Sequence, residues 1–175
     1  MLTFLALVGA LLFGLLLTIL IVFALGMRAK TPWVLSAVRR FNRAIGNPFQ
    51  MTSAGTPGAY ASVIRHTGRI TGRPYETPIV PLATEDGFVI ALPYGTNTDW
   101  LKNVLARGSA TIVKEGHNYR VDEPETVPVE AVTAYFSAKE QRNFRRFRIS
   151  QCLRVRRVDL VEAIEHPHAR EPIAS

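Results

Sequence analysis

The chain has 175 residues, of which 47% are hydrophobic, and its formal net charge is +7. This length suits one domain besides a membrane segment. The single cysteine, Cys152, excludes an intramolecular disulfide and suits a reducing compartment, and its apolar neighbours favour a buried strand residue over a nucleophile.

Residues 1–27 contain no charged side chain. A helix needs about 20 apolar residues to cross the hydrocarbon core of a bilayer, and Leu2–Leu25 supplies that length. A cleaved signal peptide would instead need Lys or Arg before the apolar run, a shorter core and a small-residue cleavage site. The sequence therefore predicts a transmembrane anchor over 1–27.

Basic residues follow this segment closely, and the first acidic residue of the chain is Glu76. By the positive-inside bias, we expect a single-pass protein of the cell membrane whose C-terminal domain lies in the cytoplasm. A basic chain beside a membrane favours anionic lipids as partners. No nucleic-acid-binding module is recognised in the sequence, so nucleic acid is not expected as a partner.

Residues 28–50 are predicted to form a basic juxtamembrane helix. A helix is expected over Pro32–Ile45, because Thr31 and Pro32 suit a helix start and Gly46-Asn47-Pro48 suits a stop. Its apolar stripe consists of Val34, Val38, Phe41 and Ile45, and its basic face consists of Arg39, Arg40 and Arg43. Two interpretations stay open: the stripe packs on the domain and the arginines are solvated, or the helix lies in the membrane interface with its arginines toward the headgroups.

Residues 51–165 are predicted to form one domain after a loop at Met51–Gly58. Short β-rich runs are expected at Tyr60–His66, Tyr75–Leu82, Phe88–Leu92, Ala110–Lys114, Tyr119–Asp122 and Leu153–Leu160. Helices are expected at Thr98–Arg107, closed by Gly108, and at Val129–Arg146. This order predicts an α+β fold in which a compact β-barrel carries inserted helices. The tail 166–175 is expected to be loose, and His166 and His168 lack the further ligands that a metal site needs.

Two segments have the composition of a ligand-binding site. The loop His66–Pro74 brings glycines, hydroxyls and two arginines together, so it can turn sharply and surround an anion; a plain basic hairpin would have the same composition. In Leu92–Asn103 a strand end passes through a glycine loop into a helix, where Trp100 and Asn103 share a face. That face can frame a planar ligand, although Trp100 also suits a place in the core.

Together, in this order and spacing, these motifs resemble the deazaflavin (F420)-dependent nitroreductase and quinone reductase family over about Ser62–Asp122, and Leu153–Val158 is similar to the family's closing strand. The resemblance implies a split β-barrel, FMN-binding-like, with the loop Gly68–Gly72 on the phosphate region of coenzyme F420. FMN is the less favoured cofactor. The cofactor-binding residues that the resemblance implies are Gly68, Arg69, Thr71, Gly72, Arg73, Thr77, Pro78, Tyr94, Gly95, Trp100 and Asn103.

The activity that the resemblance implies is hydride transfer from reduced F420, which needs positioning rather than an acid–base triad. The carboxylates are scattered singly, without the pairing that hydrolysis requires, and no residue is assigned a catalytic role. We expect a membrane-anchored oxidoreductase that reduces a lipophilic acceptor, either a quinone such as menaquinone or a nitro compound. The alternative is a non-catalytic split-barrel lipid-binding protein or an accessory subunit of a membrane complex; Ile70 and Tyr75 favour it, because many family members have basic residues there.

Overall fold

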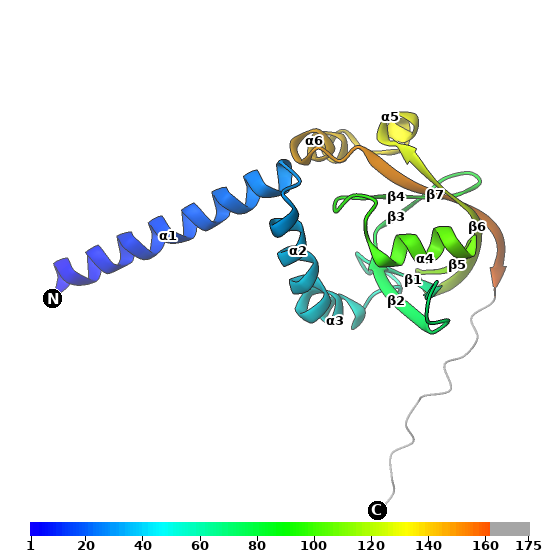
Figure 1. Ribbon diagram of the computed structural model, residues 1–175, viewed down its shortest axis with the longest axis horizontal. Helices are drawn as coiled ribbons and strands as arrows, with labels where there is room; N and C mark the ends of the chain where they lie inside the picture. Colours follow the sequence, from blue (N-terminus) through cyan, green and yellow to red (C-terminus); the bar gives the residue numbers. More distant parts are fainter. Residues whose placement is uncertain (162–175) are drawn as a thin grey trace, which may run out of the picture.

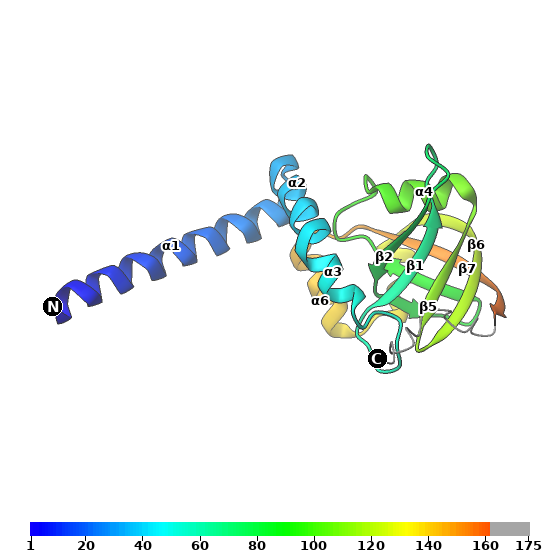
Figure 2. The same cartoon turned by 90° about the horizontal axis from the view of Figure 1, so that it is seen from below.

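The computed structural model describes residues 1–161 of the chain. A long helix, α1 (Leu2–Arg28), leads into a layer of shorter helices, and a curled β-sheet lies beyond that layer (Figures 1 and 2). Helix α1 is long and apolar enough to cross a bilayer over Ala6–Arg28. The residues from Ala6 to Leu25 are all exposed, whereas Gly26 and Met27 are buried at the end of the helix.

Helix α2 (Pro32–Phe41) begins where the sequence predicts, after an extended Thr31. The predicted stop at Gly46-Asn47-Pro48 is wrong: the helix continues through a π-helical turn, η1 (Asn42–Gly46), into α3 (Asn47–Met51). Pro48 falls in the first turn of α3, where a missing N–H costs least. The wider π-turn absorbs the interruption of the hydrogen-bond ladder, so the chain stays helical.

The predicted apolar stripe is covered over its first half only: Val34 is buried and Val38 is partly buried. Val34 is 3% exposed, and a Cβ atom added to Gly26 would lie 2.5 Å from its Cγ2 atom. Phe41 and Ile45 are each 58% exposed, because α2 packs on the end of α1 and not along a core. One arginine of the predicted basic face is engaged with the domain: Arg39 donates to the Asn97 carbonyl at 3.1 Å, whereas Arg40 is exposed. The side chain of Arg43 lies outside those that the structure describes.

Seven antiparallel strands form one sheet in the order β2-β1-β5-β6-β7-β4-β3. The strands are β1 (Ser62–Thr67), β2 (Pro74–Ile79), β3 (Pro81–Ala83), β4 (Gly87–Ala91), β5 (Ser109–Lys114), β6 (His117–Pro128) and β7 (Gln151–Val161). Its two edge strands, β2 and β3, are joined by Val80 alone, so the sheet has to curl back on itself (Figure 2). The expected α+β class, with a split barrel and inserted helices, is confirmed.

Two strands differ from the expected runs. The run Tyr75–Leu82 is divided into β2 and β3, since the chain crosses from one edge of the sheet to the other at Val80. The run Tyr119–Asp122 extends to Pro128, because β6 pairs with β7 on both sides of a register shift between Asp122 and Glu125. Charged residues and a proline in this stretch break the alternation that marks a strand, and the bulge accommodates them.

The helix expected over Val129–Arg146 is three segments: α5 (Val129–Val132), the 3-10 turn η2 (Thr133–Tyr135) and α6 (Ala138–Phe147). A capping box interrupts it. The Ser137 hydroxyl accepts from the Glu140 backbone N–H, and the Glu140 carboxylate accepts from the Ser137 N–H, which starts a new helix. The other predicted helix is α4 (Asp99–Arg107), which ends at a left-handed Gly108 as expected.

The two faces of the sheet carry separate cores. Inside the barrel, residues of the sheet pack with Leu101 and Val104 of α4. On the outer face, Val89 and Cys152 pack with Phe136 and Phe144 from the α5–α6 segment. Cys152 is 0% exposed, and burial beside the Glu130 charge raises the pKa of its thiol to about 11. The thiol therefore stays protonated, as expected of a buried strand residue.

Candidate functional site

The β1–β2 loop forms a tight turn that depends on two glycines. The Arg73 carbonyl accepts from the Gly68 N–H at 2.8 Å, and the Gly68 carbonyl accepts from the Gly72 N–H at 2.9 Å. Gly72 has a φ of +67°, which disfavours a side chain. A Cβ atom at Gly68 would lie 2.6 Å from the Thr71 hydroxyl and 2.7 Å from the Tyr75 ring. The glycines that the motif requires are thus explained by the shape of the turn.

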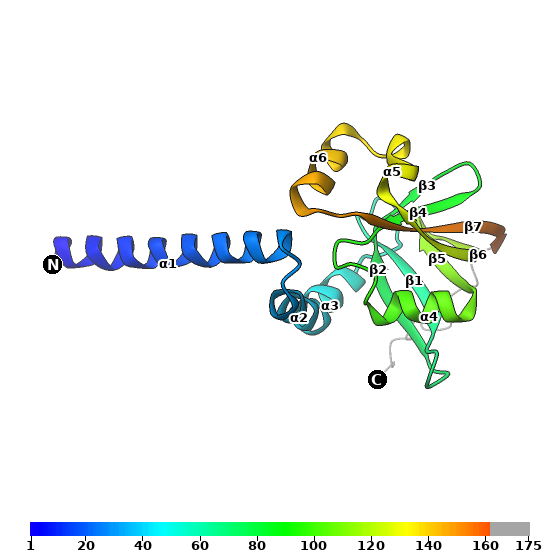
Figure 3. The same cartoon turned by 45° about the horizontal axis from the view of Figure 1, so that its top comes forward.

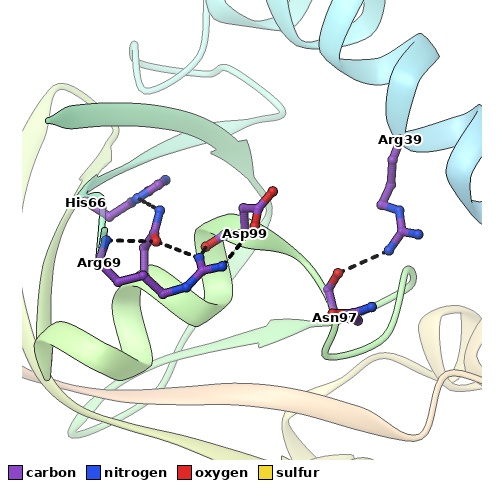
Figure 4. A network of polar contacts seen from close by, with 6 residues as sticks. Arg39, His66, Arg69, Asn97 and Asp99 are labelled. Atoms are coloured by element: carbon purple, nitrogen blue, oxygen red, sulfur yellow. Dashed lines mark hydrogen bonds and ion pairs between the residues drawn. The ribbon is translucent and has the colours of Figure 1, made fainter. Parts of the chain in front are cut away.

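Arg69 joins this loop to α4, where it contacts Asn103 and Asp99, and Figure 4 shows Arg69 beside Asp99. The Asn103 Oδ1 atom accepts from the Arg69 backbone N–H at 3.1 Å and from its guanidinium at 2.9 Å. The guanidinium also lies 3.3 Å from the Asp99 carboxylate. Asn103 is 6% exposed, so leaving its amide without these partners would be costly. The motif arginine is therefore engaged within the chain, with its charge matched by Asp99.

His66 extends the same network into the sheet. The Asn103 Nδ2 atom lies 3.3 Å from His66 Nδ1, and His66 Nε2 lies 3.2 Å from the Thr77 hydroxyl. Since the Asn103 amide nitrogen donates, His66 Nδ1 accepts and the imidazole is neutral with its proton on Nε2. Burial lowers the pKa of His66, which is consistent with the neutral form. The sequence motif gave no sign of His66 or Asp99 as members of this network.

Trp100 is partly buried and packs against the barrel core, as its position at a helix start also allowed. Thr71 and Arg73 stay on the exposed side of the turn: the Thr71 hydroxyl lies 3.2 Å from the Tyr75 hydroxyl and 3.3 Å from the Arg73 N–H that donates to it. Pro78 lies on β2, paired with Val63 of β1. Both arginines of the loop are exposed, but the Arg69 guanidinium is paired with Asp99 and Asn103.

The other predicted residues, Tyr94 and Gly95, lie in the β4–α4 loop, which contacts α2 and the turn before it. Asn42 donates to the Tyr94 hydroxyl at 2.7 Å, and Lys30 donates to the Pro93 carbonyl at 2.7 Å. Burial lowers the pKa of Lys30. Periodicity left open whether this helix packs on the domain or lies in the membrane interface, and it did not indicate these polar contacts with the loop. Of the sequence-predicted set, the structure therefore joins Gly68, Arg69, Asn103 and Thr77 in one network and holds Tyr94 and Gly95 against the juxtamembrane helix.

Thr98 precedes α4 in an extended conformation and makes no side-chain cap. It is 8% exposed, and its hydroxyl is a buried side-chain oxygen without a hydrogen-bond partner among the residues that the structure describes. The first N–H groups of a helix lack intrahelical partners. The start of α4 thus carries a buried hydroxyl next to the Arg69–Asp99 pair.

A cavity of about 400 Å³ lies elsewhere, between the α5–α6 segment and the start of β7. Its lining includes Val129, Phe144 and Ile149 together with Arg145 and Arg148. Within residues 1–161, no cluster of three or more His, Cys, Asp or Glu side chains could hold a metal ion. His166 and His168 lie outside the described residues.

Comparison with known proteins gives little beyond the fold. No family model and no curated protein matches the chain. A solved structure described as an F420 reductase is similar over 63% of this chain and 94% of its own, with a TM-score of 0.42 and 11% sequence identity. A likeness this distant leaves the function of the chain to its own residues.

Proposed function

We propose that this chain is a membrane-anchored oxidoreductase that binds the deazaflavin coenzyme F420 at the β1–β2 loop and the start of α4, and passes its hydride to a lipophilic acceptor. The observation that carries the proposal is the Arg69–Asn103 contact. Two motifs that are 34 residues apart in the chain meet through one buried amide. A coenzyme site made from both motifs requires such a meeting, whereas a plain basic hairpin does not.

The residues fit the anionic tail of F420 in part. The exposed guanidinium of Arg73 is suited to a phosphate or a carboxylate. Gly72 and Gly95 have open space where a side chain would stand, so a ligand can approach their backbone closely. Arg69 is already paired with Asp99. We therefore assign anion binding to Arg73 and the backbone, and assign to Arg69 the positioning of the loop.

The coenzyme, when bound, supplies the hydride. The chain then has to hold the ring and the acceptor in contact and keep water away, and it needs no acid–base pair. Tyr94 and Trp100 both lie in the segment Leu92–Asn103, and their aromatic side chains are suited to contact a planar ring. FMN is the less favoured cofactor because it lacks the long acidic tail that the basic loop would bind.

Membrane anchoring is the second part of the proposal. Helix α1 is apolar on every side and exposed from Ala6 to Leu25, and such a helix is stable in lipid rather than in water. A domain held at the membrane meets acceptors dissolved in the bilayer at a raised effective concentration. Quinones such as menaquinone, and apolar nitro compounds, fit this description.

A non-catalytic lipid-binding function is the second candidate. The cavity beside α6 favours it, because apolar side chains line it together with two basic residues, Arg145 and Arg148, and one acidic residue, Glu130. Such a lining suits an acyl chain with an anionic headgroup. In this case the chain would bind lipid or serve as an accessory subunit of a membrane complex, and the engaged Arg69 would be purely structural.

Absorption titration with F420 tests cofactor binding on the full-length protein in detergent. Arg73→Ala should weaken binding by about tenfold or more, since a hydrogen bond to a charged group contributes about 1.5–3 kcal/mol. Arg157→Ala, which removes an exposed charge from β7 outside both motif segments, is the matched control and should leave binding unchanged. Equal affinities of wild type and Arg73→Ala would remove the proposed anion site, and no spectral response at all would favour the lipid-binding candidate.

A further inference from the structure

An apolar face runs along the outside of α2, η1 and α3. Trp33, Phe41, Ile45 and Phe49 are 63%, 58%, 58% and 78% exposed, respectively. They recur at steps of four or eight residues, and i and i+4 share one side of a helix. The π-helical turn contains more residues per turn than an α-helix, which brings a four-residue repeat closer to the helical period. We call these four residues the outer apolar face.

The outer apolar face lies at the end of α1. Helices α2, α3 and α6 form a layer between α1 and the sheet, and α2 and α3 run across the direction of α1 (Figures 1, 2 and 3). Two contacts fix this layer: Val34 packs on Gly26, and the Arg28 guanidinium donates to the Arg146 carbonyl at 2.7 Å. If α1 is perpendicular to a bilayer, α2 and α3 therefore lie parallel to its surface.

We propose that the outer apolar face inserts into the interfacial region of the same bilayer that α1 spans, so that α2–α3 lies in the membrane plane and fixes the orientation of the barrel. This inference rests on the membrane anchoring in the proposed function. It differs from the interpretation in which the arginines of this helix meet the headgroups: Arg39 is engaged with the Asn97 carbonyl, and the exposed large apolar side chains are those of the outer apolar face.

Three features favour a bilayer as the occupant. The face is continuous with α1, with only residues 29–31 between the two helices. Tryptophan is enriched where a membrane meets water, and Trp33 lies in the first turn after the anchor. Exposed basic side chains occupy α6 in the same layer, where they can meet anionic headgroups: Lys139, Arg142, Arg145 and Arg146.

Docking would bring the candidate site close to lipid. The β4–α4 loop that carries Tyr94 and Gly95 is held directly against α2 and its preceding turn, by Lys30, Arg39 and Asn42. A helix with its side chains is about 10–12 Å across. An acceptor at the headgroup level would therefore have to cross about one helix diameter to reach this loop.

Fluorescence quenching by brominated lipids tests the proposal on the full-length protein in nanodiscs. The chain has two tryptophans, so Trp100→Phe leaves Trp33 as the reporter and Trp33→Phe leaves Trp100. Trp33 should lose about half of its emission or more with bromines near the headgroup end of the acyl chain, since interfacial helices bury their apolar side roughly 5–10 Å into this boundary. Trp100, which packs against the barrel core, is the internal control and should keep its emission.

A third reporter separates docking from anchoring. Phe13→Trp in a background of Trp33→Phe and Trp100→Phe places the fluorophore in the middle of α1. Quenching at position 13 without quenching of Trp33 would overturn docking and leave the anchor in place, and quenching at neither position would overturn both. A Trp33 that resists quenching but changes its emission with protein concentration would point to a second copy on this face, which also overturns the proposal.

Discussion

At the scale of single residues, Asn103 determines how the candidate site is built. Its side-chain amide accepts from the backbone N–H and from the guanidinium of Arg69, and it donates to His66. The loop, α4 and β1 are thus joined at a buried point. Periodicity placed Asn103 beside Trp100 on a helix face and suggested contact with a ligand. The contacts show that Asn103 holds the loop on α4 and β1 and engages the guanidinium of Arg69, while its role in binding a ligand stays a prediction.

We expect the stability of the protein to depend on the protonation of His66. Its folded pKa is lowered by burial, below the ordinary value of 6.5, so the unfolded chain binds the proton more readily. The contribution of neutral His66 to the free energy of unfolding should therefore be fully present above about pH 6.5, and it should be lost as the pH falls toward the folded pKa. Thermal unfolding of the full-length protein in detergent, followed by circular dichroism between about pH 7.5 and about pH 5, measures this change in stability on both sides of the ordinary histidine pKa.

His66→Gln should flatten this pH dependence, and His117→Gln serves as its control because His117 is exposed at the start of β6. An unchanged slope in His66→Gln would assign the pH dependence to other groups.

At the scale of elements, short capping signals decide where helices begin. The sequence analysis predicted one helix over Val129–Arg146, but the capping box of Ser137 and Glu140 begins a separate helix, α6. The sequence Ser137-Ala138-Lys139-Glu140 is a capping-box pattern, so this boundary was readable. The π-helical turn before Pro48 could not be predicted from such a pattern, because Gly-Asn-Pro ordinarily ends a helix. In the structure the chain instead stays helical from η1 into α3.

Removal of the cap should destabilise the outer core. We predict that Ser137→Ala costs about 1 kcal/mol of unfolding free energy, the usual effect of losing an N-cap hydroxyl. Phe136 and Phe144, whose ring centroids are 4.7 Å apart, pack across this boundary and should loosen with it. Urea unfolding in detergent measures the loss. Ser53→Ala, an exposed serine in the loop after α3, should change stability much less, and a similar loss in both variants would contradict the role of the cap.

At the scale of the whole molecule, the helical layer connects α1 to the barrel. Arg28 at the end of α1 donates to the carbonyl end of α6, and Arg39 and Asn42 hold the loop before α4. These contacts make the orientation of the barrel depend on that of α1. The division into an anchor, a juxtamembrane helix and a barrel domain, and the placement of the domain in the cytoplasm, remain predictions.

We expect the barrel to be protected from protease added outside intact cells, because all the basic residues that flank α1 follow it. An epitope tag at the C-terminus makes the fragment visible. The full-length band should persist in intact cells and disappear once the membrane is permeabilised. Digestion in intact cells down to the anchor would place the domain outside, and recovery of the protein in the supernatant after carbonate washing would contradict anchoring itself.

The sequence by itself determined the features that depend on local composition. These are an apolar α1 of membrane-spanning length, a helix beginning at Pro32, α4 ending at Gly108, most of the strands and the α+β class. Each of these features follows from side-chain periodicity or from the conformational preference of a glycine or proline. Predicting them therefore requires no knowledge of contacts between distant parts of the chain.

Only the tertiary structure decided which side chains of these elements are paired within the chain and which are available to a ligand or a membrane. The curl of the sheet and the position of α4 bring Arg69 into contact with Asn103 and Asp99. The packing of α2 at the end of α1 places Arg39 against the Asn97 carbonyl and leaves Phe41 and Ile45 exposed. A pattern along the chain shows that a residue can bind an anion or a membrane. Whether it is available depends on partners far away in sequence, because charge pairing and burial are properties of the folded neighbourhood.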